Sequence, residues 1–559
     1  MPTVILNKNV FEKLVGKKLP IEKLKERISM LGTDLEGIEG NEIQVEVFPN
    51  RPDMLSEQGF ARALSSFIGV KTGLRKYDVK KSGEKIIIDK SVTMRPYTAC
   101  ALVKNITFTD EKIKEIMQIQ EKLATTHGRN RRKSAYGIYP SDSINFPVHY
   151  IAKKPKDVKF KPLGLNKEIV ASEVITKHPK GKEYAYLTEG WEKYPFFIDS
   201  KDNVMCMLPF TNSEDTGKVD ENTKNVFIEC SGVDLENVKI ALNIFTTMLA
   251  DMGGEIYSID IVYPDKTITT PDLTPKKMKI DIDYVNKRLG LSLKEVEMKK
   301  LLGNMGYGYE KGSALVPAYR ADILHPMDLV EDIAIAYGYE NFNEEIPKVS
   351  TIGQEDKFEV FKRRVAYILT GLGLIETCSY HLINNDDQTK KMEMKLDCVK
   401  LSNPTTEEYN TLRQWMIPCL MNVFKNNKHY EYPQKIFDMG VVFKKNNKTE
   451  TNAEEFTRIA VATSHNNAEY TEVKQVIDYL FRMLEVEYKI EDYEHESFIP
   501  GRVGRVIVNN KKIALIGEVQ PKVLENFELN MPVACFELNL TELFNIINKW
   551  IEINILKEN

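Results

Sequence analysis

Cysteine is scarce in this sequence and forms no motif: seven residues among 559, none of them in a CxxC pair. An odd, scattered set argues against a disulfide framework and a structural zinc site and is typical of a reducing compartment. No run approaches the ~18 apolar residues that a membrane-spanning helix needs. The start, MPTVILNKNVFEKLVGKKLP, lacks the apolar core of a signal peptide. We therefore expect a soluble, cytoplasmic protein without a membrane partner.

Positive charge is not in excess either. Lys and Arg total 77 against 81 Asp and Glu, and the pI is about 6.2. Proteins that hold nucleic acid mainly by neutralising phosphates are usually strongly basic over the binding domain. Any contact with RNA is therefore expected to be local or shared with a partner chain.

The composition is that of a globular protein, with 42% hydrophobic and 28% charged residues and no low-complexity tract. Periodicity and turn residues predict a multidomain α+β chain. The predicted domains are 1–90, 91–262, 270–346 and 357–559. Segments rich in Pro and Thr at 263–277, and at 345–357, are interpreted as linkers.

Local signals predict several element boundaries. Apolar residues at helical spacing over 21–31 predict a helix that ends at Gly32. Met278, Ile280 and Ile282 alternate as in a strand, and Ser292 with Glu295 matches a capping box. Asn509-Asn510 predicts the turn of a hairpin in the last domain.

Three carboxylates share one face of a predicted helix that begins near Pro326. Asp328, Glu331 and Asp332 stand at i, i+3 and i+4, and Asp322 lies in the preceding loop. Four carboxylates that converge repel one another unless a cation lies among them. Oxygen donors without Cys or clustered His favour Mg²⁺.

A simpler alternative stays open for this segment. Acidic residues at a helix N-terminus complement the helix dipole, at about 0.3–1 kcal/mol each, without any metal. His325 is interpreted as a capping or packing residue, because neutral imidazole is a poor Mg²⁺ ligand.

A family resemblance rests on segments spread over almost the whole chain. They are PNRPDMLS (49–56), RPYTACALV (95–103), HPKGKEYAYL (178–187), TNSEDTGKVDENTKNVFIECSG (211–232), YRADILHPMDLVEDIAIAYGYENF (319–342), SNPTTEEYNTLR (402–413), NNKHYEYPQKIFDMG (426–440) and FIPGRVG (498–504). In this order they resemble the beta subunit of phenylalanine–tRNA ligase of the archaeal and eukaryotic cytosolic type.

The resemblance implies a fold and a set of partners. It implies an editing domain over 91–262, a small helix–turn–helix-like domain over 270–346 and a catalytically inactive class II synthetase core with an antiparallel sheet over 357–559. Two such chains would join two alpha subunits, which attach phenylalanine to tRNA(Phe) using ATP. The residues matching Asp322, Asp328, Glu331 and Asp332 would bind Mg²⁺ shared with the alpha subunit.

The resemblance also implies hydrolysis of mischarged tyrosyl-tRNA(Phe). An apolar pocket rejects an added hydroxyl by only about a hundredfold, whereas translation needs ~10⁴, so a second hydrolytic site is required. Matching segments assign Cys206, Asn212, Glu229 and Ser231 to that site, with Glu229 as the acceptor for the tyrosine hydroxyl. Cys206 replaces a serine and Ser231 a threonine of the family pattern. The alternative is that Cys206 is a small buried apolar residue and that Glu229 is a charge on an edge strand.

The last domain lacks the residues that grip ATP in active class II synthetases. KIFDMGVVF carries Asp438 where the second motif has an arginine, and no glycine-rich third motif is present. A carboxylate there would repel the nucleotide phosphates. We therefore expect this domain to pack against the catalytic chain.

Other readings remain at this stage. The basic run GRNRRK (128–133) favours a solvated loop over a contact with the tRNA acceptor end. A non-catalytic RNA-binding or scaffold protein would use the helix–turn–helix-like domain, although that domain lacks an Arg-rich recognition helix. A freestanding editing hydrolase would leave most of the chain without a purpose.

Overall fold

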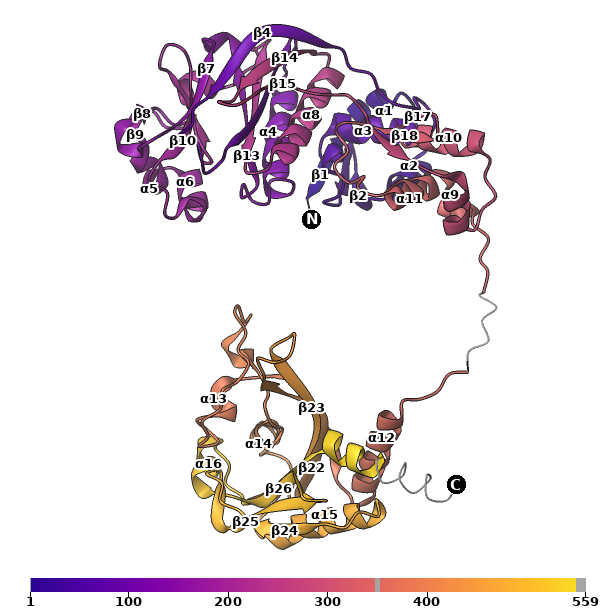
Figure 1. The fold of residues 1–559 in the computed structure, drawn as a ribbon, viewed down its shortest axis with the longest axis vertical. Helices are drawn as coiled ribbons and strands as arrows, with labels where there is room; N and C mark the ends of the chain where they lie inside the picture. The colour runs from indigo at the N-terminus through magenta and orange to yellow at the C-terminus, as the bar shows by residue number, and fades with distance from the viewer. Residues whose placement is uncertain (1, 347–351, 549–559) are drawn as a thin grey trace. The chain divides into compact units, whose positions relative to one another are not determined.

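The computed structural model describes residues 2–346 and 352–548. They form two compact units, Met1–Ile346 and Pro347–Asn559 (Figure 1). The boundary falls in the linker predicted over 345–357, part of which lies outside the described residues. In the described part of the chain, no helix is long and apolar enough to cross a membrane.

The N-terminal part of the first unit is a small sheet covered by helices. Its strands follow the order β1-β3-β2. The elements are β1 (Thr3–Asn7), β2 (Asp34–Glu39), β3 (Glu42–Glu46), α1 (Lys8–Val15), α2 (Ile21–Met30) and α3 (Glu57–Phe67). The predicted end of the second helix is confirmed, because Gly32 follows it with a φ of 91°. Ser56 caps α3 by accepting a hydrogen bond from the Gly59 amide.

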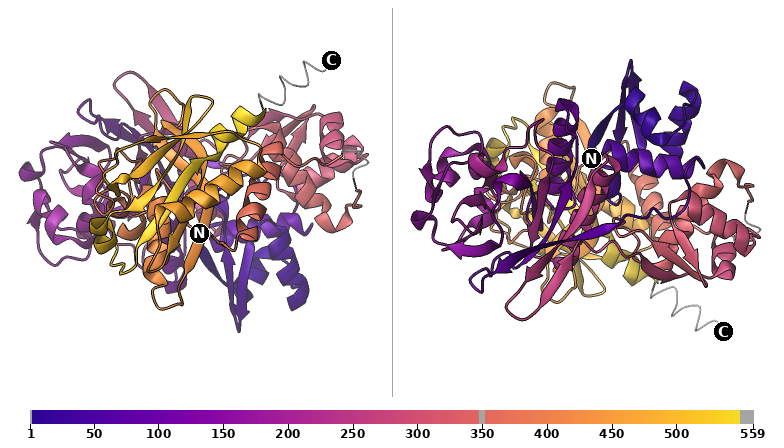
Figure 2. Two further views of the ribbon diagram at one scale, coloured as in Figure 1. Left: turned by 90° about the horizontal axis from the view of Figure 1, so that it is seen from below. Right: turned by 90° about the horizontal axis from the view of Figure 1, so that it is seen from above.

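A ten-stranded sheet is the centre of the first unit. Nine strands follow the order β12-β11-β10-β7-β4-β14-β5-β13-β6, and β15 pairs with β14. Their bounds are β4 (Val79–Ile88), β5 (Tyr97–Lys104), β6 (Ser134–Pro140), β7 (Val148–Lys153), β10 (Tyr194–Ile198), β11 (Val204–Met207), β12 (Thr211–Asn212), β13 (Val226–Gly232), β14 (Glu255–Val262) and β15 (Thr267–Thr270). The long strands β4 and β14 run side by side, as Figures 1 and 2 show.

This sheet corrects two predicted boundaries. β4 belongs to the large sheet, where it pairs with β14 and β7, so a first domain that extends to residue 90 is too long. β15 lies inside the segment 263–277 that was expected to be a linker. The reason is long-range pairing, which local composition does not reveal.

Two helices cover one face of the large sheet, and the sheet curls around its other face. α4 (Asp110–Thr125) and α8 (Leu235–Asp251) lie against β5, β13 and β6 (Figure 1). On the other face the two ends of the strand path meet, since the Tyr139 hydroxyl on β6 donates to Asn212 Oδ1 on β12 at 3.0 Å. The curl encloses a second apolar core. Shorter elements at its rim are β8 (Lys159–Phe160), β9 (Ile169–Val170), α5 (Val174–Lys177), α6 (Pro179–Tyr184) and α7 (Glu214–Gly217).

The third part of the first unit packs three helices on a small sheet of order β16-β18-β17. Its elements are β16 (Lys276–Lys279), β17 (Gly308–Glu310), β18 (Ser313–Val316), α9 (Ile282–Leu289), α10 (Glu295–Asn304) and α11 (Pro326–Tyr337). Two local predictions are wrong here. Ile282 begins a helix, and at the start of α10 the Glu297 carboxylate accepts the Lys294 amide, two residues later than the predicted Ser292 and Glu295.

One apolar core joins the three parts of the first unit. It contains Phe60 of α3, Phe245 of α8 and Leu302 of α10, each 0% exposed. Most of α8 is buried within it. Burial of apolar area at about 25 cal/mol per Å² is what makes such a junction stable. The first unit is therefore a single packed body.

The second unit is a mostly antiparallel sheet of order β19-β22-β23-β27-β26-β25-β24. Its main elements are α12 (Lys357–Gly371), β19 (Ile375–Thr377), α14 (Ile417–Asn426), β22 (Gln434–Lys445), β23 (Ala453–Ser464), α15 (Tyr470–Met483), β24 (Lys489–Asp492), β25 (Phe498–Val508), β26 (Lys511–Val519), α16 (Pro521–Asn526) and β27 (Val533–Asn539). α12 and α15 pack on one face, and α14 and α16 on the other. The predicted turn is confirmed, because Asn509 and Asn510 adopt φ of 47° and 61° between β25 and β26.

Candidate functional site

Glu229 places a carboxyl group in the interior of the large sheet. It lies on β13, opposite Cys100 of β5 and Gly137 of β6, and it is 0% exposed. Strand alternation directs Phe227, Glu229 and Ser231 to the same face, where Phe227 belongs to the core enclosed by the curl. The alternative that Glu229 is a charge on an edge strand is therefore wrong, since β13 has a partner on both sides.

The surroundings of Glu229 leave its carboxyl only partly satisfied. The Ser231 hydroxyl donates to Oε1, and it lies 3.1 Å from the Thr98 hydroxyl. Oε2 has no hydrogen-bond partner among the described residues. Burial raises the pKa of Glu229 from 4.5 to about 7, although the Ser231 hydroxyl, the nearby Arg95 guanidinium and the Tyr139 hydroxyl act in the opposite direction. The carboxyl is thus poised between its neutral and ionised forms near physiological pH.

Tyr139 connects Glu229 to the other predicted editing residues. Its hydroxyl donates to Asn212. Burial raises the pKa of Tyr139, and the nearby Glu229 carboxylate raises it further. Cys206 pairs opposite Asn212 between β11 and β12. Burial, and then the charge of Glu229, raises the pKa of the Cys206 thiol, so it stays protonated and is a poor nucleophile.

Asn212 also borders a cleft of about 560 Å³. The cleft lies between α4 and the segment 208–219, and its walls include Ile116, Gln120, Arg131, His178 and Val219. Cys206, Glu229 and Ser231 are each 0% exposed. The structure therefore brings the four predicted residues into one region, in which Asn212 faces the cleft and the other three lie in the core behind it.

Three residues of this region were missed by sequence reasoning. Besides Tyr139 they are Thr98, and Arg95, which is 2% exposed and donates to the Ser231 carbonyl at 3.0 Å. An arginine at the start of the apolar run RPYTACALV is the signal that could have singled out Arg95, because a buried guanidinium needs fixed acceptors. Nothing local distinguishes Tyr139 from the many other aromatic residues.

The basic run 128–133 is largely structural. Residues 129–131 have positive φ and form a turn before β6. The Arg131 guanidinium donates to the carbonyls of Pro209 and Phe210 at 2.9 and 3.0 Å, and to Glu121 at 3.0 Å. It thereby fixes one wall of the cleft. Arg129 and Arg132 are exposed, as expected of a solvated loop.

The acidic segment is neutralised in part by an arginine. Asp322 receives two hydrogen bonds of 2.8 Å from the Arg320 guanidinium, and Asp332 receives one of 2.8 Å from the same group. The Tyr307 hydroxyl also donates to Asp332. The cation between these two carboxylates is therefore the Arg320 side chain, which is 7% exposed.

The other two carboxylates point elsewhere. Asp328 Oδ2 accepts the amides of Leu324 and His325 at 2.7 Å, as in a capping box, while the His325 ring accepts the Met327 amide. The capping role expected of His325 is confirmed. Glu331 is exposed and accepts a hydrogen bond from Tyr339. Within 2–346 and 352–548, no three His, Cys, Asp or Glu side chains are placed to hold a metal ion.

The carboxylate in the second unit is buried. Asp438 of β22 is 2% exposed and accepts hydrogen bonds from the amide and hydroxyl of Ser379. Arg413 donates to the same Ser379 hydroxyl at 2.8 Å and lies against Gly440, where a Cβ would come within 2.0 Å of it. Burial raises the pKa of Asp438. Asp438 and Arg413 are thus engaged with Ser379 and with backbone carbonyls inside this unit.

Comparisons with known proteins agree along the whole chain. Residues 278–339 match the tRNA synthetase B5 domain, and residues 343–540 match the phenylalanyl tRNA synthetase beta chain CLM domain. The phenylalanine–tRNA ligase beta subunit of Pyrococcus horikoshii is 40% identical over 97% of this chain and 100% of that protein. The Archaeoglobus fulgidus beta subunit is 39% identical over 98% and 99%.

A solved structure is similar as well. The crystal structure of an N-terminal fragment of the phenylalanyl-tRNA synthetase beta subunit from Pyrococcus horikoshii is 39% identical, with a TM-score of 0.58. The matched region covers 60% of this chain and 99% of the fragment.

The buried carboxyl predicts a specific dependence of stability on pH. The unfolded Glu229 carboxyl ionises near pH 4.5 and the folded one near pH 7, so the free energy of unfolding falls as the pH rises through this interval. Glu229→Gln removes that loss. Between pH 4.5 and pH 7.5, the stability of the Gln variant relative to the parent should rise by about 2–4 kcal/mol.

Urea unfolding of the full chain at several pH values measures this difference. Glu189→Gln makes the same change in charge at an exposed position of the same unit and serves as the control. A difference between Glu229→Gln and the parent that does not change with pH would contradict the assignment.

Proposed function

The chain belongs to the family of phenylalanine–tRNA ligase beta subunits, and we propose that it acts with an alpha subunit to attach phenylalanine to tRNA(Phe) using ATP. The observation that carries this proposal is the identity of 40% to a beta subunit over 97% of the chain. We expect two alpha and two beta chains in the assembly. The synthetic site would lie on the alpha subunit.

The second unit supports that division of labour. An adenylate-forming site must neutralise the phosphates of ATP as charge develops on them. In this unit the corresponding strand presents Asp438, buried and bonded to Ser379, and the neighbouring Arg413 is held by backbone carbonyls and Ser379. The Asp438 carboxylate would repel the nucleotide phosphates, and Arg413 already donates its hydrogen bonds within the unit, so neither residue favours nucleotide binding. The unit is better suited to packing against the catalytic chain.

We also propose that the first unit hydrolyses mischarged tyrosyl-tRNA(Phe) at the region of Glu229. The ester end would enter the cleft bordered by Asn212, and the tyrosine hydroxyl would donate to the carboxylate of Glu229. Its Oε2 is buried without a partner, so a phenol would satisfy it, whereas a phenylalanine ring would leave it unsatisfied. This asymmetry is a physical basis for sparing the correct product.

The hydrolysis needs no covalent intermediate. A water oxygen attacks the ester carbonyl, the bond to the ribose oxygen breaks, and that oxygen takes up a proton. The buried Cys206 thiol, whose pKa is raised, is not suited to act as a nucleophile. Asn212, half-buried at the cleft, can hold the ester or the water through its amide. The Tyr139 hydroxyl bonds to the amide oxygen of Asn212, so the Asn212 NH2 group stays available to the substrate.

Magnesium fits this chain only in part. Asp322 and Asp332 are engaged by Arg320, so the four carboxylates do not form a cage. We propose that Asp328 and Glu331 are the two oxygen donors offered to an ion shared with the alpha subunit. Mg²⁺ commonly keeps several waters and uses one or two carboxylates from a protein. When bound, the ion would supply charge neutralisation between the two chains.

The first prediction tests the proposed assembly. The isolated chain should show no phenylalanine-dependent ATP–pyrophosphate exchange, and addition of the alpha subunit should restore it. Exchange measured with purified chains, alone and mixed, decides the point. Robust exchange by the chain without any alpha subunit would contradict the proposal, as would its absence in the mixture.

A second prediction tests proofreading in the assembled enzyme. Glu229→Ala removes a charged acceptor, whose hydrogen bond is worth roughly 1.5–3 kcal/mol, so deacylation of tyrosyl-tRNA(Phe) should slow about tenfold to a hundredfold. Asn212→Ala should act in the same direction. Phenylalanylation should remain normal in both, and Glu189→Ala should affect neither activity. Unchanged deacylation in both variants would place the editing pocket elsewhere, and a parallel loss of phenylalanylation would indicate damage to the fold.

A third prediction concerns the acidic segment. The double variant Asp328→Asn, Glu331→Gln keeps the cap of α11, because an Asn oxygen still accepts backbone amides. The Mg²⁺ concentration needed for assembly with the alpha subunit should then rise by roughly tenfold or more. The readout is complex formation in analytical ultracentrifugation during a Mg²⁺ titration. Asp322→Asn, which weakens the pair with Arg320, should lower stability without this shift. An unchanged Mg²⁺ requirement in the double variant would mean that these carboxylates only cap the helix.

A further inference from the structure

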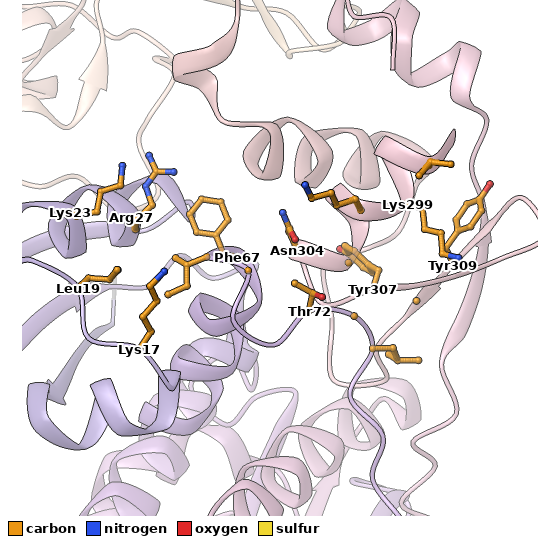
Figure 3. A pocket seen from close by; sticks show the side chains of 18 residues that line it. Lys17, Leu19, Lys23, Arg27, Phe67, Thr72, Lys299, Asn304, Tyr307 and Tyr309 are labelled. Carbon is orange, nitrogen blue, oxygen red and sulfur yellow. The ribbon is translucent and has the colours of Figure 1, made fainter. Parts of the chain in front are cut away.

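A second cleft, of about 950 Å³, opens between the N-terminal and third parts of the first unit. Figure 3 shows its two walls. One carries Lys17, Lys23 and Phe67, and the other carries Lys299 and Tyr307. It shares no lining residue with the cleft of Asn212. None of the predicted site residues borders it.

The lining of this cleft carries charge of one sign. Its ionisable groups are five cations, Lys17, Lys23, Arg27, Lys299 and Lys300, together with two tyrosines, and no carboxylate lines it. Although the whole chain has slightly more acidic than basic residues, cations from separate segments meet in this cleft. Cations clustered in this way make the electrostatic potential of the cleft positive, which attracts anions.

Neighbouring acids neutralise only part of that charge. Glu26 lies 2.9 Å from Lys23 and 2.6 Å from Arg27, and Glu340 lies 2.7 Å from Arg27. Lys17, Lys299 and Lys300 are exposed.

Those three lysines have no ion pair in the part of the chain that the structure describes. Their charge is therefore available to a ligand from solution.

The two walls are held at a fixed separation. The Gly73 amide donates to the Gly303 carbonyl at 2.7 Å, and both residues line the cleft. The pair of Arg27 with Glu340 joins α2 to the segment that follows α11. The apolar core continues through both parts. The backbone positions of the lysines are therefore set before a ligand arrives, and binding orders only their side chains.

The lining favours a polyanionic backbone over unstacked bases. Proteins that bind single strands offer exposed aromatic faces for stacking. Here Phe67 is 8% and Tyr307 1% exposed, and the hydroxyl of Tyr309 is tied to Glu295. Phosphates of a double helix need only well-placed cations, which this cleft has.

We propose that this cleft docks the phosphate backbone of double-helical RNA, with Lys17, Lys299 and Lys300 as its contacts. The choice of RNA as the polyanion rests on the proposed function, because tRNA is its substrate. The contact positions the RNA without reading its sequence. It also explains how a chain without net positive charge can hold RNA.

The test measures how binding depends on salt. Each phosphate neutralised by a lysine adds about 0.7–0.9 to the slope of log K against log salt concentration. In the assembled enzyme, the triple variant Lys17→Gln, Lys299→Gln, Lys300→Gln should lower the slope for a tRNA(Phe) transcript by about two to three. Fluorescence anisotropy between 50 and about 200 mM salt is the measurement.

A matched triple variant controls for the change in net charge. Lys395→Gln, Lys400→Gln and Lys448→Gln lie at exposed positions of the second unit and should leave the slope unchanged. Phenylalanine-dependent pyrophosphate exchange should be normal in both triple variants, because it needs no RNA. An unchanged slope in the cleft variant would overturn the proposal.

A simple RNA hairpin separates this proposal from the proposed function. The cleft variant should lose slope on the hairpin as it does on the transcript, whether or not the complex charges tRNA. Loss confined to single-stranded poly(U) would overturn the assignment to a double helix. If the cleft variant binds anionic lipid vesicles more weakly but keeps its salt slope on the hairpin, the cleft docks a membrane surface, and the proposal is overturned.

Discussion

Three buried guanidinium groups hold the first unit together, and each must be neutralised where it lies. Arg51 binds Asp53 with two hydrogen bonds of 2.9 Å, and Arg320 binds Asp322 with two of 2.8 Å. Both pairs have the same local form, an arginine and an aspartate two residues later. Because a buried charge without a partner is strongly destabilising, loss of either aspartate would cost stability.

Arg62 extends this network to the large sheet. Its guanidinium donates to Asp251 at the end of α8 and to the Tyr77 hydroxyl, and it lies 4.1 Å from the centre of the Tyr319 ring. These contacts tie together the N-terminal part, the sheet and the third part. The same rigidity sets the walls of the basic cleft and the position of α8 behind β13. The acidic segment was expected to gather around a metal, yet half of its carboxylates serve this arginine network instead.

Glu229 is buried as well, but its charge is not neutralised by a partner as that of Arg320 is. Arg320 is buried between two carboxylates that accept its hydrogen bonds, whereas Glu229 retains an oxygen without a partner and a pKa raised to about 7. A protein tolerates such a group only at a cost in stability. The curl of the sheet creates the surroundings of Glu229, because it brings β6 and β12 together and places Tyr139 among the same residues.

The sequence by itself determined what depends on near neighbours in the chain. Helix ends at Gly32 and Pro326, the capping role of His325 and the turn at Asn509-Asn510 follow from contacts within a few residues, and the ordered motifs were sufficient to indicate the family. Tertiary structure alone decided which distant groups meet. It placed β4 in the large sheet, Tyr139 between Asn212 and Glu229, Arg320 between two carboxylates, and Lys17 opposite Lys299. Strand pairing and buried charge pairs join residues tens to hundreds of positions apart, so no local pattern encodes them.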